Sequence, residues 1–218
     1  MERNLQNSEL YEARYGYKES RANFIFYAVL LCFALLLCVF RVWWGSNFWG
    51  VVVDGESMIY TLEDGDKLLV RRVKDAEKLD YGTIIVVDVS DYPECQGIKD
   101  GLLIKRLIAK EGDKVRCENG CLEICYQGTD SFIEVPEPYA HYKDRNAYDF
   151  DTYTVGEGEV FFLGDNRNES KDSRYYDYPN GSHLQDSLYK IDNVVGYLPD
   201  WAYEHKEILE RIFFIGEE

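Results

Sequence analysis

The chain has 218 residues and a formal net charge of −16, from 40 acidic and 24 basic side chains. This charge excludes nucleic acid as a partner, because phosphate binding requires a basic surface. It also argues against a broad electrostatic attraction to anionic lipid, so any attachment to a membrane must come from apolar segments.

The first predicted element is an apolar segment from Phe24 to Phe40, seventeen residues without a charge. With its flanks it reaches the roughly 20 residues that cross a hydrocarbon core. The alternative is a cleaved secretory leader, which has a shorter apolar core and a small-residue cleavage site. The tryptophan-rich sequence after Arg41 is a poor cleavage site. We therefore predict a retained transmembrane helix.

The charges on either side of this segment set its expected orientation. Four basic residues precede it, whereas the first basic residue beyond Arg41 is Lys67. Basic residues are enriched on the cytoplasmic side of membrane spans. We therefore predict a cytoplasmic segment at 1–23, a transmembrane helix at 24–44 and an extracytoplasmic domain at 45–218. Three tryptophans are expected at the membrane interface: Trp43, Trp44 and Trp49.

The domain at 45–218 contains short apolar, β-branched runs separated by Gly, Asp and Asn, which are typical of strands. The expected strands lie at 49–53, 66–73, 83–87, 101–109, 115–126 and 159–163. Only Glu204–Phe214 has helical periodicity. Because strands and helices do not alternate, we predict a mainly β fold of folded antiparallel sheets or a partial barrel. The acidic, tyrosine-rich stretch at 126–154 is expected to be a surface excursion.

Six cysteines divide between the two predicted parts. Cys32 and Cys38 lie in the apolar segment and are expected to act as small apolar residues. The other four lie in the extracytoplasmic part, where disulfides persist: Cys95, Cys117, Cys121 and Cys125. They allow three pairings, and a bridge between Cys117 and Cys121 across a hairpin is one candidate. No metal site is expected, because a paired C-x-x-C spacing and a nearby histidine are lacking.

One serine and one lysine offer a route to nucleophilic catalysis. A serine hydroxyl is a weak nucleophile until a base takes its proton, and a lysine can be that base when burial keeps its amine neutral. Ser57 follows a predicted strand, and Lys105 lies in an apolar run. On a strand Lys105 would share the core face with Leu103 and Leu107. Taken singly, a turn serine and a surface lysine explain the two residues more simply.

Other nucleophile arrangements fit the sequence less well. The segment around Ser57 lacks the second glycine of a nucleophile elbow, and the chain lacks the α/β alternation that supports one. A Ser-His-Asp triad would need one of three histidines that lie in polar or tyrosine-rich stretches: His141, His183 and His205. The sequence offers no support for such a triad.

Four segments follow the apolar segment in order: Asp54–Leu62, Gly65–Val70, Ile104–Asp113 and Leu163–Arg174. Together they resemble the signature segments of bacterial type I signal peptidases, and the resemblance covers about residues 20–200. It implies the fold of that family and a membrane-bound serine endopeptidase that removes signal peptides from exported preproteins. It further implies a dyad that works without a cofactor. Ser57 would form an acyl-enzyme, and Lys105 would be the general base.

The resemblance also implies supporting roles near the dyad. Ser170 would form a hydrogen bond with Lys105 and orient it. Asp172 and Arg174 would form an ion pair that holds the loop against the site. Two further residues would complete the surroundings: Asp165 would help to fix that loop, and Met58 would line the base of the cleft.

Two positions depart from the family pattern. Many members have proline where this chain has Tyr60, so the turn after the nucleophile is expected to be less rigid or to be held by the tyrosine ring. Some members have a serine where this chain has Gly55, which has no hydroxyl to offer an oxyanion. The second oxyanion donor, beside the N–H of Ser57, would then be another backbone N–H or a water.

The predicted protein is a monomer whose partners are exported preproteins and the lipid bilayer. Two alternatives remain. A regulatory or self-cleaving Ser/Lys protease on the same fold would normally be soluble, and the predicted anchor argues against it. A non-catalytic, membrane-anchored β module would be free to lose a site residue, whereas this chain has the whole set: Ser57, Lys105, Ser170, Asp172 and Arg174.

Overall fold

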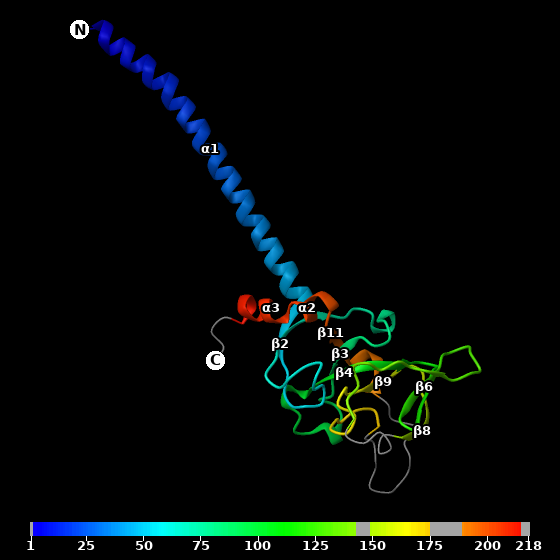
Figure 1. Cartoon of the computed structure of the whole chain (residues 1–218). Coiled ribbons are helices and arrows are strands. Elements are labelled where there is room, and N and C mark those ends of the chain that lie inside the picture. Colours follow the sequence, from blue (N-terminus) through cyan, green and yellow to red (C-terminus); the bar gives the residue numbers. More distant parts are fainter. Residues whose placement is uncertain (1, 143–148, 175–188, 215–218) are drawn as a thin grey trace. The chain divides into compact units, whose positions relative to one another are not determined.

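The first part of the structure is one long helix. A computed structural model describes residues 2–142, 149–174 and 189–214, and the chain divides into two compact units after Asn47. Helix α1, Glu2–Asn47, forms the first unit (Figure 1). Its stretch Arg21–Asn47 is apolar and long enough to cross a membrane, by length and composition. A helix that is apolar on all sides without being buried is typical of a membrane span.

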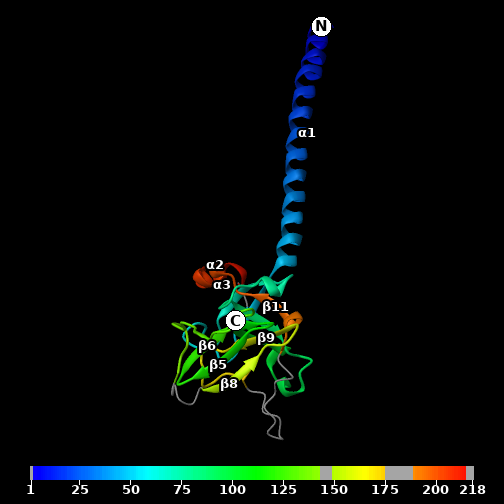
Figure 2. The ribbon, with the colours of Figure 1, turned by 90° about the vertical axis from the view of Figure 1, so that its right-hand side faces the viewer.

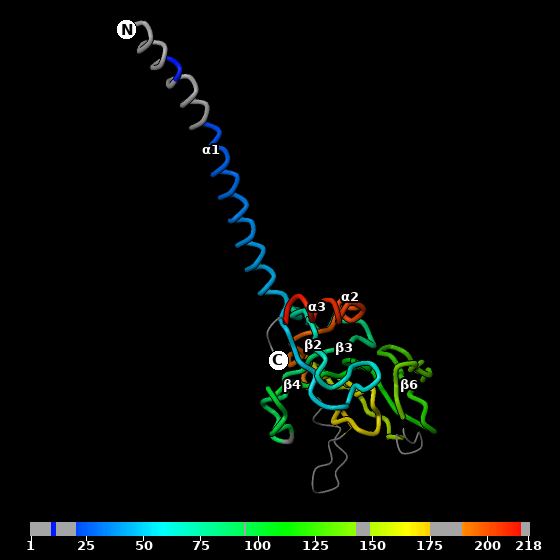
Figure 3. Tube along the Cα trace, turned by 60° about the vertical axis from the view of Figure 1, so that its left-hand side comes forward, coloured from blue at the N-terminus to red at the C-terminus, as the bar shows by residue number. Residues whose placement is uncertain are grey.

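The second unit is built on a seven-stranded sheet in which each strand is antiparallel to its neighbours (Figures 1 and 3). In spatial order its strands are β1 Phe48–Val52, β2 Lys67–Arg72, β11 Val194–Tyr197, β3 Ile84–Asp88, β4 Leu102–Lys110, β9 Glu159–Leu163 and β10 Tyr189–Lys190. The predicted mainly β, antiparallel fold is confirmed. The sequence did not predict β11, which lies inside the sheet between β2 and β3.

A smaller antiparallel sheet follows the order β7 Ile133–Glu134, β6 Cys121–Cys125, β5 Lys114–Glu118 and β8 Phe150–Thr154 (Figure 2). The expected strand at 115–126 is a hairpin, because Asn119 and Gly120 have φ angles of 55° and 71°. Positive φ at both central residues is what a two-residue type I′ turn requires. Part of the stretch at 126–154 therefore belongs to this sheet, and residues 143–148 lie outside the described chain.

The remaining elements are short helices. Among the described residues, 3₁₀ turns occur at Ala76–Lys78, Pro93–Cys95, Lys99–Gly101 and Ile191–Asn193. Two α-helices, α2 Asp200–Glu204 and α3 Lys206–Phe213, pack against β2. They account for the helical periodicity predicted at 204–214.

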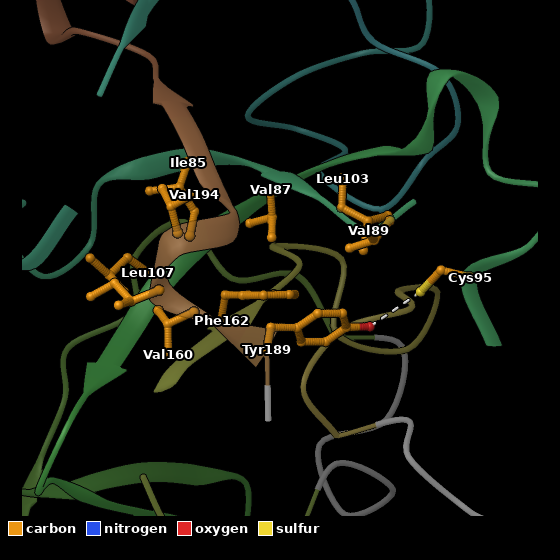
Figure 4. Close-up of a cluster of buried hydrophobic side chains, with 11 residues drawn as sticks. Ile85, Val87, Val89, Cys95, Leu103, Leu107, Val160, Phe162, Tyr189 and Val194 are labelled. Atoms are coloured by element: carbon orange, nitrogen blue, oxygen red, sulfur yellow. Dashed lines mark hydrogen bonds between the residues drawn. The ribbon is translucent and has the colours of Figure 1, made fainter. Parts of the chain in front are cut away.

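The centre of the larger sheet is buried on both faces. Ile85 and Val87 of β3 pack against Phe162 on one face (Figure 4). Ile84 and Val86 point the opposite way, into a second apolar cluster. A third cluster joins the two sheets through Ile108, Ala109, Phe161 and Leu163 with Val115, Cys117, Leu122 and Ile124. The centre of the sheet is therefore held by close packing on each side, which restricts side-chain movement there.

The four cysteines outside α1 are all free thiols. The predicted candidate bridge between Cys117 and Cys121 is wrong. The hairpin register pairs Cys117 with Leu122 and Cys121 with Glu118, so the two cysteines are not opposite each other. Paired residues share a face and adjacent residues do not, so the two thiols point to opposite sides of the hairpin. Burial and the Asp149 carboxylate raise the pKa of Cys117 to about 12, which keeps it a thiol.

Trp49 of β1 packs in an apolar cluster of the larger sheet, and its expected place at the membrane interface stays a prediction. Its ring joins the apolar cluster on one face of the sheet, and the guanidinium of Arg72 lies 4.7 Å from the ring centroid. The ring covers Gly196 so closely that a Cβ at that position would lie 2.0 Å from Trp49 Cη2 and 2.8 Å from Val70 Cγ1. Position 196 therefore requires glycine, because the Trp49 ring lies too close for any side chain.

We predict that Gly196→Ala destabilises the protein by about 1–3 kcal/mol, because the added methyl overpacks a closely packed site. Urea denaturation of the full chain in detergent would measure the change. Gly45→Ala is a control, since nothing lies within 4 Å of the added Cβ. Equal midpoints for Gly196→Ala and wild type would contradict this account of the packing.

Candidate active site

Ser57 lies in a compact turn that follows β1. The turn begins at Gly55, whose φ of 94° favours glycine and whose N–H donates to Asp64 Oδ1 at 2.7 Å. It ends where the N–H of Leu62 donates to the carbonyl of Met58 at 2.8 Å. Met58 is only 1% exposed, so it anchors the turn in the core beside the half-buried Ser57. Within the described chain, the backbone N–H of Ser57 meets no acceptor.

Lys105 lies at the middle of β4, directly opposite Ile85 of β3. It shares the buried face of β4 with Leu103 and Leu107, as the sequence predicted, and only 2% of it is exposed. Its Nζ donates to Ser57 Oγ at 2.7 Å and to the carbonyl of Ile104 at 2.9 Å. The fold therefore brings together two residues 48 positions apart in the chain.

The environment of this amine favours its neutral form. Burial lowers the pKa of Lys105 from 10.5 to about 8, because the charged form has lost its hydration. The carboxylates of Asp172 and Asp165 act in the opposite direction. Each of them binds an arginine, Arg174 or Arg106, and this pairing weakens its effect on the lysine. The loss of hydration therefore outweighs the two carboxylates, and the pKa of Lys105 is lowered.

Asp165 connects the loop after β9 to β4, which carries Lys105, and to the turn that carries Ser57. Its carboxylate is fully buried and accepts two hydrogen bonds from Arg106, from Nε at 2.8 Å and from Nη2 at 2.6 Å. It also accepts one from Thr61 Oγ1 at 2.6 Å. Arg106 follows Lys105 on β4 and Thr61 belongs to the turn of Ser57. The predicted role of Asp165 in fixing the loop thus has a geometric basis.

Asn166 holds the Ser57 turn from the other side, a contact the sequence did not predict. Its N–H donates to the carbonyl of Ser57 and its Nδ2 to the carbonyl of Glu56, both at 3.0 Å. Gly164 allows this approach, because a Cβ there would lie 2.6 Å from the carbonyl oxygen of Ser57. The hydrogen bond to Glu56 fixes the peptide unit that carries the Ser57 N–H, and the one to the Ser57 carbonyl fixes the next peptide unit.

The predicted hydrogen bond between Ser170 and Lys105 is not present. The hydroxyl of Ser170 is buried against Gly164 and acts on the Asp172 carboxylate, whose pKa it helps to lower. The predicted ion pair is present, with Arg174 Nε 2.8 Å from Asp172 Oδ1. Burial alone would raise the pKa of Asp172, but Arg174 and the N–H of Gly164 outweigh it and hold that pKa below its ordinary value.

A second buried ion pair joins the stretch at 126–154 to the same loop. Arg167 is 1% exposed and forms a two-pronged contact with the buried Glu137. The N–H of His141 donates to the carbonyl of Asp165 at 2.7 Å, and the N–H of Arg167 donates to that of His141 at 3.0 Å. The expected surface excursion is therefore bound to the site loop, through residues that no local sequence pattern indicated.

Tyr60 has a φ of 70°, which a proline ring cannot adopt. Its side chain is 71% exposed and meets the ring of His141 edge to face, with centroids 4.5 Å apart. The expectation that the ring helps to hold the turn agrees with this contact. His141 and His205 form no hydrogen bond with Ser57, and His183 lies outside the described residues.

A cleft of about 600 Å³ opens beside the Ser57 hydroxyl. One wall is formed by β1 and the residues that follow it, with Val51, Val52 and Val53. The other wall is formed by the segment that leads into β4 and the start of that strand, with Ile98, Leu102 and Ile104. Both walls are largely apolar, and Lys99, Asp100 and Lys171 add charges. Within the described chain, no group of three His, Cys, Asp or Glu residues is placed to hold a metal ion.

Comparison with known proteins places this chain among the peptidases. The family model for signal peptidase, peptidase S26, matches residues 22–198, which is most of the chain. The chain belongs to that family.

Two curated relatives and one solved structure illustrate the similarity. Signal peptidase I P of Bacillus subtilis subsp. natto is 36% identical over 132 residues, 56% of this chain and 64% of the relative. Probable signal peptidase I-1 of Synechocystis is 33% identical over 128 residues, 58% and 61% of the two chains. The matches thus span less than two thirds of these relatives. A signal peptidase I structure from Enterococcus faecalis is 25% identical with a TM-score of 0.40, covering 56% of this chain and 97% of the other.

The buried pair of Arg167 and Glu137 supports a prediction about stability. Glu137→Gln should destabilise the protein by about 3–5 kcal/mol, because it leaves a buried guanidinium without a counter-charge. Urea denaturation in detergent would measure it. The matched control is Asp75→Asn, which removes a partner of the exposed Lys78 and should change little. Similar small effects for both variants would show that the buried pair does not hold the loop.

Proposed function

We propose that this protein is a membrane-anchored serine endopeptidase that removes signal peptides from exported preproteins. One observation carries the proposal: the buried Lys105 amine donates to Ser57 Oγ at 2.7 Å, at the edge of a peptide-sized cleft. Membership of the signal peptidase family supports the same activity.

In the proposed reaction, neutral Lys105 takes the proton of the Ser57 hydroxyl as the oxygen attacks the scissile carbonyl. The N–H of Ser57, held in place through Asn166, donates to the oxyanion. The protonated lysine then gives its proton to the leaving amine, which leaves an acyl-enzyme on Ser57. Lys105 next activates a water that hydrolyses the ester and restores the serine. No step requires a metal or a cofactor.

The cleft suits an extended peptide. β1 is an edge strand of the larger sheet, and one side of it faces the cleft. A substrate strand can add to such an edge through backbone hydrogen bonds, which makes binding independent of most side chains. Shallow apolar walls then favour small side chains next to the scissile bond, as in the family.

We further propose that α1 spans the membrane through Arg21–Asn47, with the N-terminus in the cytoplasm and the second unit outside. The apolar stretch supports the anchor, and the basic residues before it support the orientation. An enzyme and a substrate held in one bilayer meet at a high effective concentration, so the cleft need not bind the preprotein tightly.

Removal of either dyad residue should abolish activity. We predict that Ser57→Ala and Lys105→Met each reduce cleavage of a model preprotein by at least about 10³-fold, since nucleophile or base is lost. The assay would follow product formation by the full chain in detergent and identify the new N-terminus. Matched controls are Ser90→Ala and Lys114→Met, which alter a serine and a lysine outside the cleft. Substantial turnover by either dyad variant would reject the mechanism.

Activity should rise with pH, because only the neutral form of Lys105 is the base. With a pKa of about 8 for this amine, kcat/KM should increase about 50-fold between pH 6 and pH 8 and then level off. A profile that is flat over this range would contradict a lysine base.

The pH dependence of stability provides an independent check. The folded pKa of Lys105 lies below its unfolded value of 10.5, so the unfolded chain binds more protons. Stability should therefore increase by about 3 kcal/mol as pH rises from about 8 to 10.5. Lys105→Met should lack this increase, which urea denaturation at several pH values would reveal without any substrate.

A further inference from the structure

The backbone N–H of Met58, the residue after Ser57, has no hydrogen-bond acceptor in the described chain. The other polar groups of this residue are bound. Its carbonyl accepts from the N–H groups of Thr61 at 3.0 Å and Leu62 at 2.8 Å, and its thioether accepts from the N–H of Asp165 at 3.4 Å. Met58 is only 1% exposed, and buried backbone N–H groups without a partner are rare because they cost free energy. This N–H therefore calls for an explanation.

Two carbonyls of the turn determine where this N–H points. The carbonyls of Glu56 and Ser57 both accept hydrogen bonds from Asn166, one from its Nδ2 and one from its backbone N–H, each at 3.0 Å. In a trans peptide unit, the form found throughout the described chain, the N–H points opposite to the C=O. The two peptide units held in this way carry the N–H groups of Ser57 and Met58. Both N–H groups therefore point away from Asn166, in the same general direction.

This pair of N–H groups lies where the proposed reaction develops a negative charge. Ser57 and Met58 both line the cleft, and Nζ of Lys105 donates to the Ser57 hydroxyl at 2.7 Å. Successive backbone N–H groups that point the same way form a concave site for an anion. When the Ser57 hydroxyl attacks a peptide bond, the carbonyl oxygen of the substrate becomes an oxyanion, and donors aimed at that oxygen stabilise the transition state.

We propose that the Met58 N–H is the second oxyanion donor of the active site, acting together with the N–H of Ser57. The inference rests on the proposed function and extends it, because it assigns the donor that Gly55, which has no hydroxyl, leaves open. As the Ser57 oxygen forms its bond to the carbonyl carbon, the hydroxyl proton passes to Lys105 and the π electrons of the carbonyl move onto its oxygen. That oxygen accepts from both N–H groups until the C–N bond breaks and the carbonyl forms again.

The N–H groups that precede Ser57 in the turn are less suited to this role. The N–H of Gly55 already donates to Asp64 Oδ1 at 2.7 Å. The N–H of Glu56 has no acceptor in the described chain, but this residue is exposed, so solvent can bind the group. Asn166 does not hold the peptide unit of that N–H, because the carbonyl of the unit belongs to Gly55. The N–H of Met58 is buried, unpaired and fixed in direction, and the N–H of Glu56 is none of these except unpaired.

The test replaces single backbone N–H groups by oxygen, which removes the donor and leaves the side chains unchanged. The full chain is produced by translation with an α-hydroxy acid at one position, and cleavage of the model preprotein is measured in detergent. The ester at Met58 should reduce kcat by about 100-fold, the effect of losing one oxyanion donor, while KM stays close to that of wild type. The pH at which activity is half-maximal should not change, because Lys105 is not altered.

Two further esters separate the donor from other effects. The ester at Glu56 removes an N–H that has no acceptor in the described chain, and it should leave kcat close to that of wild type. An ester carbonyl is a weak acceptor, so the Met58 ester also weakens the hydrogen bond between the Ser57 carbonyl and Asn166. The ester at Asn166 removes that same bond but keeps the Met58 N–H, so it should reduce kcat much less. In urea denaturation the Met58 ester should be no less stable than the Asn166 ester, because its missing N–H had no partner.

The outcomes distinguish this inference from the proposed function. If wild type cleaves the preprotein and the Met58 ester cleaves it as fast, the second donor is a water or another group and the inference is wrong. Equal losses of kcat at Met58 and Asn166 would also reject it, since the weakened Ser57 carbonyl would then explain both. A Met58 ester less stable than the Asn166 ester would show that the N–H has a structural partner. If wild type itself does not cleave, the proposed function fails and the oxyanion site fails with it.

Discussion

The burial of one lysine amine is the constraint on which the rest of the structure depends. A charged amine loses its hydration inside a protein, and the effective cost is several kcal/mol. At Lys105 this cost lowers the pKa to about 8. The side chain is buried because it lies on the covered face of β4, between Leu103 and Leu107 of an apolar cluster. The 16 excess negative charges of the chain act against the shift, but most are at the surface, where solvent screens them. The two carboxylates that are close and buried, Asp165 and Asp172, each bind an arginine.

The loop after β9 positions the two dyad residues and also binds the stretch at 126–154. These two roles explain why it contains so many charged residues. Asp165 and Asn166 connect it to β4 and to the Ser57 turn, so the nucleophile and the lysine are positioned against each other by one segment. Arg167 connects it to Glu137, which brings the stretch at 126–154 into the support of the site. Buried charges are costly when unpaired, and each of these is paired with good geometry. Such a network fixes a single arrangement of the loop.

Features with a local signal were predictable from the sequence. Alternation of apolar residues gave the strands around Ser57 and Lys105, and it correctly put Lys105 on the core face with Leu103 and Leu107. Features that depend on the meeting of distant segments were not predictable. β11 is four residues long and interrupted by Gly196, so its position inside the sheet follows only from pairing with β2 and β3. The Arg167 and Glu137 pair joins residues 30 positions apart. Resemblance supplied the identity of Ser170 but not its side-chain direction, which depends on contact with Gly164.

The arrangement at Ser57 also explains why the turn tolerates an unusual backbone. A bulky residue at positive φ is disfavoured by about 1–3 kcal/mol and persists only where its surroundings determine it. The turn at Tyr60 is held on both sides, by Thr61 through Asp165 and by Ser57 through Asn166. Because these flanking bonds fix residues 57 and 61, the backbone between them has little freedom, and the ring is directed outward against His141. The strain at Tyr60 is thus a consequence of clamping the nucleophile, and the same hydrogen bonds that cause it fix the direction of the Ser57 N–H.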